Sequence, residues 1–497
     1  MMREGAPKTI YRKDYTAPDF LISHVELAFE IEDGNTRVTS ALRIQRNGTH
    51  DRPLILDGEG LGLITVSIDG STLDESAFKY VGGKLTVDSV PNEFAFGAVV
   101  DIQPETNTSL EGLYRSRTMY CTQCEAEGYR KIAFGLDRPD VLSTYTVTLS
   151  ADKRTCPILL SNGNEVSRTD LANGRHQVVW HDPHPKPSYL FAIVAGDLEL
   201  VSDTFTTESG KVVDLRIWVE AKDTGYCAHA MDSLKASMRW DEERYGLEYD
   251  LDLFNIVAVD DFNMGAMENK SLNIFNTSCV LAHPDITTDL GYQRVESVVA
   301  HEYFHNYSGN RVTCRDWFQL SLKEGFTVFR DAEFSADMNS RGVKRIEDVS
   351  FLQTHQFAED SGPMAHPVRP DSFIEISNFY TMTVYEKRAE VVRMLNTLLG
   401  DDAFYAGAKL YFDRFDGMAV TCDDFVDAMQ ETSGKDLSQF RRWYEQAGTP
   451  VVSIEKVFDE TSGRLDLTFT QANPPTPSHD ATPPLPTPQT LALPAHG

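Results

Sequence analysis

The segment His301-Glu302-Tyr303-Phe304-His305 reads H-E-x-x-H, and the sequence around it has the character of a helix. Residues four apart on a helix lie on the same face, so the two imidazoles can converge on one metal ion. Glu324 follows after residues 306–323, within a second helix-like segment, 320–330. A carboxylate from a second helix completes a three-ligand zinc site with one open position, which is typical of catalytic zinc. The pattern predicts one Zn²⁺ per chain, bound by His301, His305 and Glu324.

Glu302 lies beside a ligand in sequence but faces a neighbouring part of the helix surface. There it can take a proton from a metal-activated water, which is the role of a general base. The alternative is a chance match on an ordinary amphipathic helix. Apolar residues at 295, 298, 299 and 304 fit a helical period, and the second helix is also present. The zinc interpretation is therefore favoured.

Composition restricts the class of protein further. The 497-residue chain carries a net charge of −29, which argues against nucleic acid and anionic membranes as partners. No stretch approaches the roughly 20 apolar residues of a membrane span, and the N-terminus has no apolar signal core. Seven scattered cysteines fit reduced thiols, and Cys121-Thr-Gln-Cys124 is interpreted as unreactive thiols rather than a metal or redox pair. A cytoplasmic enzyme is expected.

The character of the sequence changes along the chain. Residues 1–197 are rich in short β-branched and aromatic runs, which predict an N-terminal β domain. Residues 198–448 combine strand patterns with helices, including 228–245, a helix capped by Thr421 and a helix over 437–447. Residues 449–470 predict a hairpin that begins an incomplete β domain, and the Pro-rich segment 471–497 is interpreted as disordered. The fold class is multidomain α+β.

A second motif, Asn263-Met-Gly-Ala-Met-Glu-Asn269, follows one predicted strand and precedes another. Together with H-E-x-x-H-x18-E, it resembles the gluzincin metallo-aminopeptidases, in particular the bacterial aminopeptidase N group. Further strings that carry the resemblance are Gln123–Gly128, Gly309–Glu324, Pro363–Pro367 and Phe379–Lys387. The resemblance runs from near the N-terminus to about residue 470. It implies a saddle-like β domain, then a thermolysin-like catalytic domain.

The resemblance also implies residue roles. Glu268 and Glu125 would bind the free α-amine of a peptide substrate, since a cation in a partly desolvated pocket needs charged partners. Tyr385 would donate a hydrogen bond to the oxyanion. The remaining implied substrate contacts are Gln123, Met264, Gly265, Ala266, Met267 and Tyr380. The implied activity is removal of N-terminal residues (Ala, Leu, Met or basic) by a monomeric enzyme that needs a free amine.

Three strings differ from those of the family. They are His305-Asn-Tyr-Ser-Gly309 for His-Asn-Trp-Thr-Gly, Glu268-Asn-Lys-Ser271 for Glu-Asn-Lys-Gly, and Glu386-Lys-Arg388 for Glu-Lys-Gly. Family members also continue into a large helical domain, so the chain is interpreted as C-terminally truncated. Four alternatives stay open: an inactive fragment, a non-catalytic scaffold on the same fold, an epoxide hydrolase relative, and a thermolysin-like endopeptidase that lacks the second motif.

Overall fold

The computed structural model describes residues 8–477 and 482–488, which divide into two compact units. The larger unit holds residues 16–316 and 415–420. The helical unit holds the described parts of 1–15, 317–414 and 421–497. This division follows contacts within the chain, and the domain boundaries at 197, 448 and 470 stay predictions.

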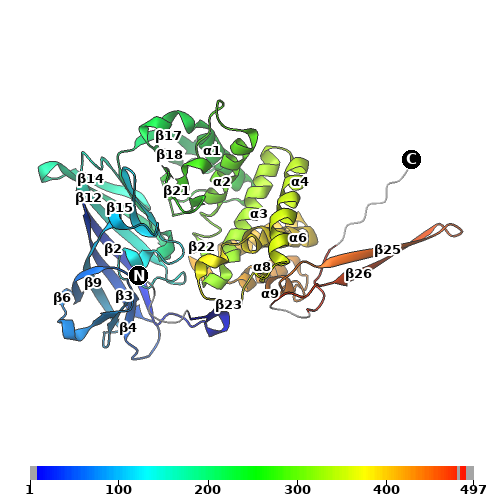
Figure 1. The fold of residues 1–497 in the computed structure, drawn as a ribbon, viewed down its shortest axis with the longest axis horizontal. Coiled ribbons are helices and arrows are strands. Elements are labelled where there is room, and N and C mark those ends of the chain that lie inside the picture. The colour runs from blue at the N-terminus through cyan, green and yellow to red at the C-terminus, as the bar shows by residue number, and fades with distance from the viewer. Residues whose placement is uncertain (1–7, 478–481, 489–497) are drawn as a thin grey trace. The chain divides into compact units, whose positions relative to one another are not determined.

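An eight-stranded sheet forms the first part of the larger unit, in the order β14-β15-β12-β2-β3-β9-β5-β6 (Figure 1). Its strands are β2 (Phe20–Glu32), β3 (Asn35–Arg46), β5 (Gly62–Ile68), β6 (Ser71–Thr72), β9 (Glu93–Ile102), β12 (Ser143–Asp152), β14 (Asn164–Asp170) and β15 (Arg175–Lys186). Burial alternates along β2 and β3 because successive side chains point to opposite faces of the sheet. The prediction of a β-rich N-terminal region is confirmed.

Two smaller sheets complete this β-rich region. The first has the order β10-β11-β16-β13, with β10 (Gly112–Ser116), β11 (Met119–Gln123), β16 (Ile193–Gly196) and β13 (Ile158–Ser161). The second is built from β4 (Leu54–Asp57), β8 (Lys84–Val87) and β7 (Lys79–Val81). Every residue of β11 is buried, so the chain leaves this strand from the interior of the unit.

A mixed five-stranded sheet follows, in the order β17-β18-β19-β21-β20 (Figure 1). Its strands are β17 (Glu199–Thr206), β18 (Val212–Val219), β19 (Leu253–Val259), β20 (Ala266–Met267) and β21 (Leu272–Asn276). All seven residues of β19 are buried, as expected for a strand held in parallel between β18 and β21. β20 pairs only with β21 among the described strands and therefore lies at the edge of the sheet.

Two helices belong to the same unit, α1 (Ala228–Tyr245) and α2 (Asp289–Phe304). The Thr288 hydroxyl accepts a hydrogen bond from the backbone nitrogen of Gly291, and Asp289 adds a negative charge to the first turn of α2. Both features stabilise a helix N-terminus. Beyond α2, β22 (Val312–Cys314) pairs in parallel with β24 (Met418–Val420), which comes from much later in the chain.

The helical unit is built mainly from α3 (Leu320–Met338), α4 (Arg341–Phe351), α5 (Phe357–Asp360), α6 (Arg388–Leu399), α7 (Asp401–Phe415) and α8 (Cys422–Ser433). Helix α3 is buried along most of its length, so it forms the centre of this unit. Thr421 and Asp424 form a capping box at the start of α8, which confirms the predicted cap. A short pairing of β1 (Ile10–Tyr11) with β23 (Ser372–Phe373) joins the N-terminal segment to the unit.

The predicted helix over 437–447 is largely wrong. Only α9 (Arg442–Glu445) is α-helical there, because most backbone hydrogen bonds in this segment span three residues rather than four. The predicted hairpin is confirmed as β25 (Val451–Asp459) and β26 (Arg464–Ala472), which project from the helices of the unit (Figure 1).

The Pro-rich segment predicted to be disordered lies partly outside the described residues, at 478–481 and 489–497. Its described part makes specific contacts within the helical unit. The indole of Trp443 donates to the carbonyl of Pro486 over 2.8 Å, and the Gln471 amide donates to Leu485 over 2.8 Å. Within residues 8–477 and 482–488, no helix has both the length and the apolar character needed to cross a membrane.

Candidate zinc and amine-binding site

His301 and His305 lie at the C-terminal end of α2, one helical turn apart. Their Nε2 atoms are 3.0 Å apart, and His305 is only 1% exposed. Two nitrogens bound to one tetrahedral zinc at about 2.0–2.1 Å stand about 3.3 Å from each other. The pair therefore has the spacing of two ligands of a single zinc ion.

The ring of His305 is held by a contact on its other nitrogen. Nδ1 lies 2.8 Å from the carbonyl oxygen of Ser308, and a carbonyl only accepts, so Nδ1 donates. The lone pair of a neutral imidazole is then on Nε2, the atom that faces His301. Hydrogen bonds of this kind orient zinc-binding histidines and fix their tautomer.

Gly309 permits this geometry. Its φ of 147° is one that side-chain-bearing residues rarely adopt, and a Cβ there would lie 2.8 Å from Nδ1 of His305. The turn after α2 can therefore fold back against the His305 ring only because residue 309 has no side chain.

Two glutamates form a second cluster in the same unit. Glu125 follows β11 and Glu268 follows β20, and their carboxylate oxygens approach within 4.8 Å of each other. Glu268 is 3% exposed and Glu125 is half-buried. Two carboxylates this close repel unless a proton or a cation lies between them. The arrangement therefore suits a bound ammonium group.

The acid pair and the histidine pair are connected through Asn310. Its side-chain nitrogen donates to the carbonyl oxygen of Glu268 over 2.9 Å. Its backbone nitrogen donates to the carbonyl oxygen of His305 over 2.9 Å. One residue thus joins the chain at Glu268 to the end of α2.

The residues before Glu268 lie at the edge of the five-stranded sheet, where a substrate backbone could pair with them. Ala266 and Met267 form the edge strand β20, and the Gly265 carbonyl accepts from the backbone nitrogen of Asn276 over 2.9 Å. Met264 is half-buried and Gly265 is exposed. An edge strand can accept an extended peptide as an additional strand. Gln123, at the end of β11, is fully buried.

Three of the predicted site residues lie in the helical unit. Glu324 is buried in the second turn of α3, where Lys323 donates to its carboxylate. Tyr380 and Tyr385 lie before and within the π-helical turn Thr383–Lys387, with ring centroids 6.5 Å apart. Glu324 thus belongs to the other unit than His301 and His305, and a zinc ion bound by all three stays a prediction. Glu302 is buried on α2 beside His301.

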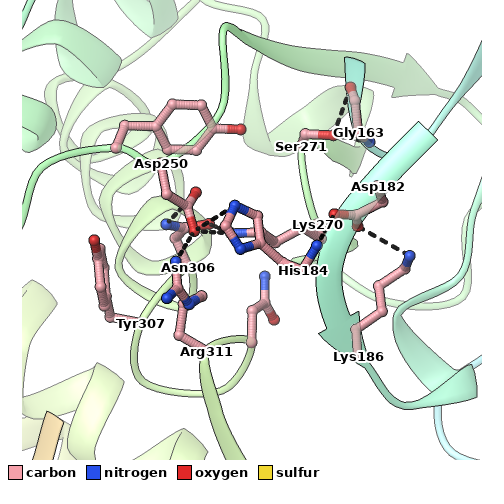
Figure 2. A network of polar contacts seen from close by, with 12 residues as sticks. Gly163, Asp182, His184, Lys186, Asp250, Lys270, Ser271, Asn306, Tyr307 and Arg311 are labelled. Atoms are coloured by element: carbon pink, nitrogen blue, oxygen red, sulfur yellow. Dashed lines mark hydrogen bonds and ion pairs between the residues drawn. The ribbon is translucent and has the colours of Figure 1, made fainter. Parts of the chain in front are cut away.

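The sequence pattern missed a network of buried charges next to the site (Figure 2). Lys270 and Asp250 form a buried ion pair, and the Lys270 ammonium also donates to Asn306 over 2.8 Å. The available signal was a lysine two residues after Glu268 in a segment otherwise typical of a buried strand.

The cysteines behave as predicted. All seven are free and buried. Burial raises the pKa of the Cys121 thiol to about 12 and also raises the pKa of Cys124 well above its usual value. A thiol with a raised pKa is a poor nucleophile and a poor metal ligand at neutral pH.

Comparison with known proteins agrees with this geometry. Residues 229–444 match the model of the peptidase family M1 domain, and residues 21–190 match the peptidase M1 N-terminal domain. The chain is 53% identical to aminopeptidase N of Escherichia coli over 487 residues, which is 98% of this chain and 56% of that protein. It is also 53% identical to aminopeptidase N of Caulobacter vibrioides, with 93% and 54% covered.

The fold is also similar to that of a solved aminopeptidase structure. The chain superimposes on the crystal structure of Legionella pneumophila aminopeptidase A in complex with aspartic acid with a TM-score of 0.88. The two sequences are 33% identical, and the match covers 94% of this chain and 54% of that one. This chain thus spans about half the length of the relatives that it matches.

Proposed function

Because this chain belongs to the M1 peptidase family, we propose that it is a zinc-dependent aminopeptidase that releases N-terminal residues from peptides. The observation that carries the proposal is the link between two clusters in one unit. The acid pair Glu125 and Glu268 can bind an ammonium, and Asn310 ties Glu268 to the zinc-type histidine pair. An ammonium anchor at a fixed distance from a hydrolytic centre selects the end of a chain over its middle.

In this proposal, His301, His305 and Glu324 hold the zinc ion. The bound ion would supply Lewis-acid activation of water and of the scissile carbonyl. Glu302 accepts the proton of the attacking water and passes it to the leaving amine. Tyr385 donates a hydrogen bond to the oxygen that becomes negatively charged.

The substrate would lie along β20. Its α-amine would contact Glu268 and Glu125, and its backbone would add to the open edge formed by Gly265, Ala266 and Met267. Gln123, Met264 and Tyr380 would surround the first side chain. An adaptable methionine there fits broad acceptance of Ala, Leu, Met and basic residues. The proposal also includes that the enzyme is a monomer and acts in the cytoplasm.

The test is hydrolysis of alanyl- and leucyl-p-nitroanilide by the zinc-loaded chain, with the N-acetylated compounds as matched substrates. Free-amine substrates are expected to turn over, and acetylated ones are not. Glu302→Gln should lower kcat by about 10²–10⁴ while zinc stays bound. Glu347→Gln, an exposed change on α4, serves as the control.

Two results would contradict the proposal. Equal cleavage of acetylated substrates would remove the role assigned to Glu125 and Glu268. Stoichiometric zinc binding without turnover of any substrate would favour the alternative of an inactive chain on this fold.

A further inference from the structure

Lys270 lies two residues beyond Glu268 and is 1% exposed. Its ammonium belongs to the network of polar contacts in Figure 2. It donates to Asp250 Oδ2 over 2.5 Å and to Asn306 Oδ1 over 2.8 Å. The Asn306 side chain in turn donates to Asp250 Oδ1 over 3.3 Å. Lys270, Asp250 and Asn306 therefore form a closed triangle of charged and polar contacts.

Asn306 is the residue directly after His305. The triangle thus joins the chain that carries Glu268 to the chain that carries a proposed zinc ligand. Asn310 makes a second, parallel connection between the same two segments, from the Glu268 carbonyl to the His305 carbonyl. With contacts at the Glu268 carbonyl and at Lys270, the segment that follows β20 cannot shift relative to the end of α2 without breaking one of them.

Other residues hold the triangle in place. Arg311 donates to Asp250 Oδ2 over 2.7 Å, and His184 from β15 lies 3.5 Å from the same oxygen. The Asn162 amide donates to the Lys270 carbonyl over 2.8 Å. Hydrogen bonds therefore hold Lys270 both at its side-chain ammonium and at its backbone carbonyl.

A buried ion pair is weak evidence of stabilisation by itself, because desolvation offsets much of the attraction. The same region contains such a pair with only an indirect link to the triangle: Lys186 Nζ lies 2.9 Å from Asp182 Oδ2, and both are fully buried (Figure 2). Asp182 accepts from the backbone nitrogen of His184 over 3.1 Å, but Lys186 contacts neither Asp250 nor Asn306 by a hydrogen bond or ion pair. What distinguishes Lys270 is that it lies in the segment that carries Glu268 and donates to Asn306, the residue directly after His305.

We infer that Lys270 is a positioning residue that fixes the distance between the ammonium anchor and the zinc-binding histidines. This inference rests on the proposed function. It concerns ligands that contact both clusters at once, since only those depend on the distance between them. The affinity of a ligand that contacts only one cluster does not depend on this distance.

A matched pair of hydroxamates measures this dependence. Leucine hydroxamate carries a zinc-binding group and an α-amine, and 4-methylpentanohydroxamate is the same molecule without the amine. Their ratio of dissociation constants, measured by calorimetry on the zinc-loaded full chain, isolates the contribution of the amine. In the unsubstituted chain the amine compound should bind more tightly.

Lys270→Met should reduce this ratio by about 10–100-fold, because a ligand held at two points loses alignment with one of them when they move apart, and a misplacement of about 1 Å costs about 10²-fold in enzymatic rates. Binding of 4-methylpentanohydroxamate should change little. Asn306→Ala, which leaves the Lys270–Asp250 pair in place, should reduce the ratio in the same direction. Lys186→Met is the control, because it removes a buried ammonium of the same unit without touching either segment.

An unchanged ratio in folded Lys270→Met overturns the inference, as does an equal fall in Lys186→Met. If Lys270→Met does not fold, Asn306→Ala decides in the same way. If the unsubstituted chain binds both hydroxamates equally, the proposed function itself fails and the inference falls with it.

Discussion

The hydroxyl oxygen of Ser271 accepts a hydrogen bond from the backbone nitrogen of Gly163 over 2.6 Å. Ser271 has a φ of 59°, in the left-handed region that favours glycine, and the related family string has glycine there. Ser271 thus has an unfavourable backbone conformation, but its hydroxyl makes a favourable hydrogen bond. It connects the turn after Glu268 to the β-rich region.

Substitutions at this position separate the two effects. Ser271→Ala keeps the backbone strain and loses the hydroxyl, so its free energy of unfolding should fall by about 1 kcal/mol. Ser271→Gly also loses the hydroxyl but removes strain of about 1–2 kcal/mol, so it should stay near the unsubstituted protein. Urea denaturation measures both, and a glycine variant less stable than the alanine variant would contradict this account.

Gly309→Ala should weaken zinc binding. The added Cβ would lie 2.8 Å from Nδ1 of His305 and would disturb the hydrogen bond to Ser308 that orients the ring. Loss of such an orienting contact typically costs 10–100-fold in affinity, and about this loss is expected in competition with a chelator. Gly246→Ala is the control: its φ is also positive, at 68°, but its Cβ would meet nothing within 4 Å. The control should keep its zinc affinity.

The pH dependence of stability should reveal Asp250. Burial alone would raise the pKa of Asp250, but Lys270, His184 and Arg311 overcome this effect and hold the pKa well below its usual range. A carboxyl with a lowered folded-state pKa stabilises the fold above its unfolded pKa of about 3.9. This contribution is lost as the pH falls through the folded-state pKa.

Asp250→Asn should therefore lower the melting temperature clearly at pH 7, and the difference from the unsubstituted protein should shrink below about pH 4. Part of the difference should remain, because Lys270 keeps its charge without its partner. Melting curves from pH 7 to pH 3 test this expectation, with the exposed Asp285→Asn as control. A difference that grows towards low pH would show that the sign is wrong.

Gly325 and Arg388 should be strongly coupled. A Cβ on Gly325 would lie 2.0 Å from Cγ and 2.4 Å from Cβ of Arg388, so α3 and α6 would have to separate. Gly325→Ala alone should cost about 1–3 kcal/mol. In an Arg388→Gly background both side-chain clashes are gone and only the Arg388 carbonyl carbon, at 3.2 Å, stays close, so the cost should fall by more than half. A double-mutant cycle by urea denaturation measures this coupling, and additive effects would contradict it.

The parts of this protein that follow from local chemistry could be predicted from its sequence. The helix that carries His301 and His305, the cap at Thr421 and the hairpin around Asp459–Gly463 each depend on a few neighbouring residues. The predictions of the fold class and of the family are also confirmed, because long strings of the chain resemble known relatives. The roles of Glu302, Tyr385 and the pocket residues stay predictions.

Long-range contacts could not be predicted in this way. The triangle of Lys270, Asp250 and Asn306 joins residues from three separate segments, and no local pattern indicates that they meet. The prediction of a helix over residues 437–447 was wrong for a related reason. Trp443 bonds to Pro486, and Arg369 donates its backbone nitrogen to the carbonyl of Tyr444, so tertiary partners compete with regular helical bonds there.

The parallel pairing of β22 with β24 affects the order in which the protein can mature on the ribosome. Arg311 Nε donates to Asp416 over 2.8 Å, and the Gly417 backbone nitrogen donates to the Arg311 carbonyl over 2.8 Å. The turn after the zinc-type histidines is thus completed by residues translated about a hundred codons later. The histidine and acid pairs emerge early, but their surroundings close only after α3 to α7 have been synthesised.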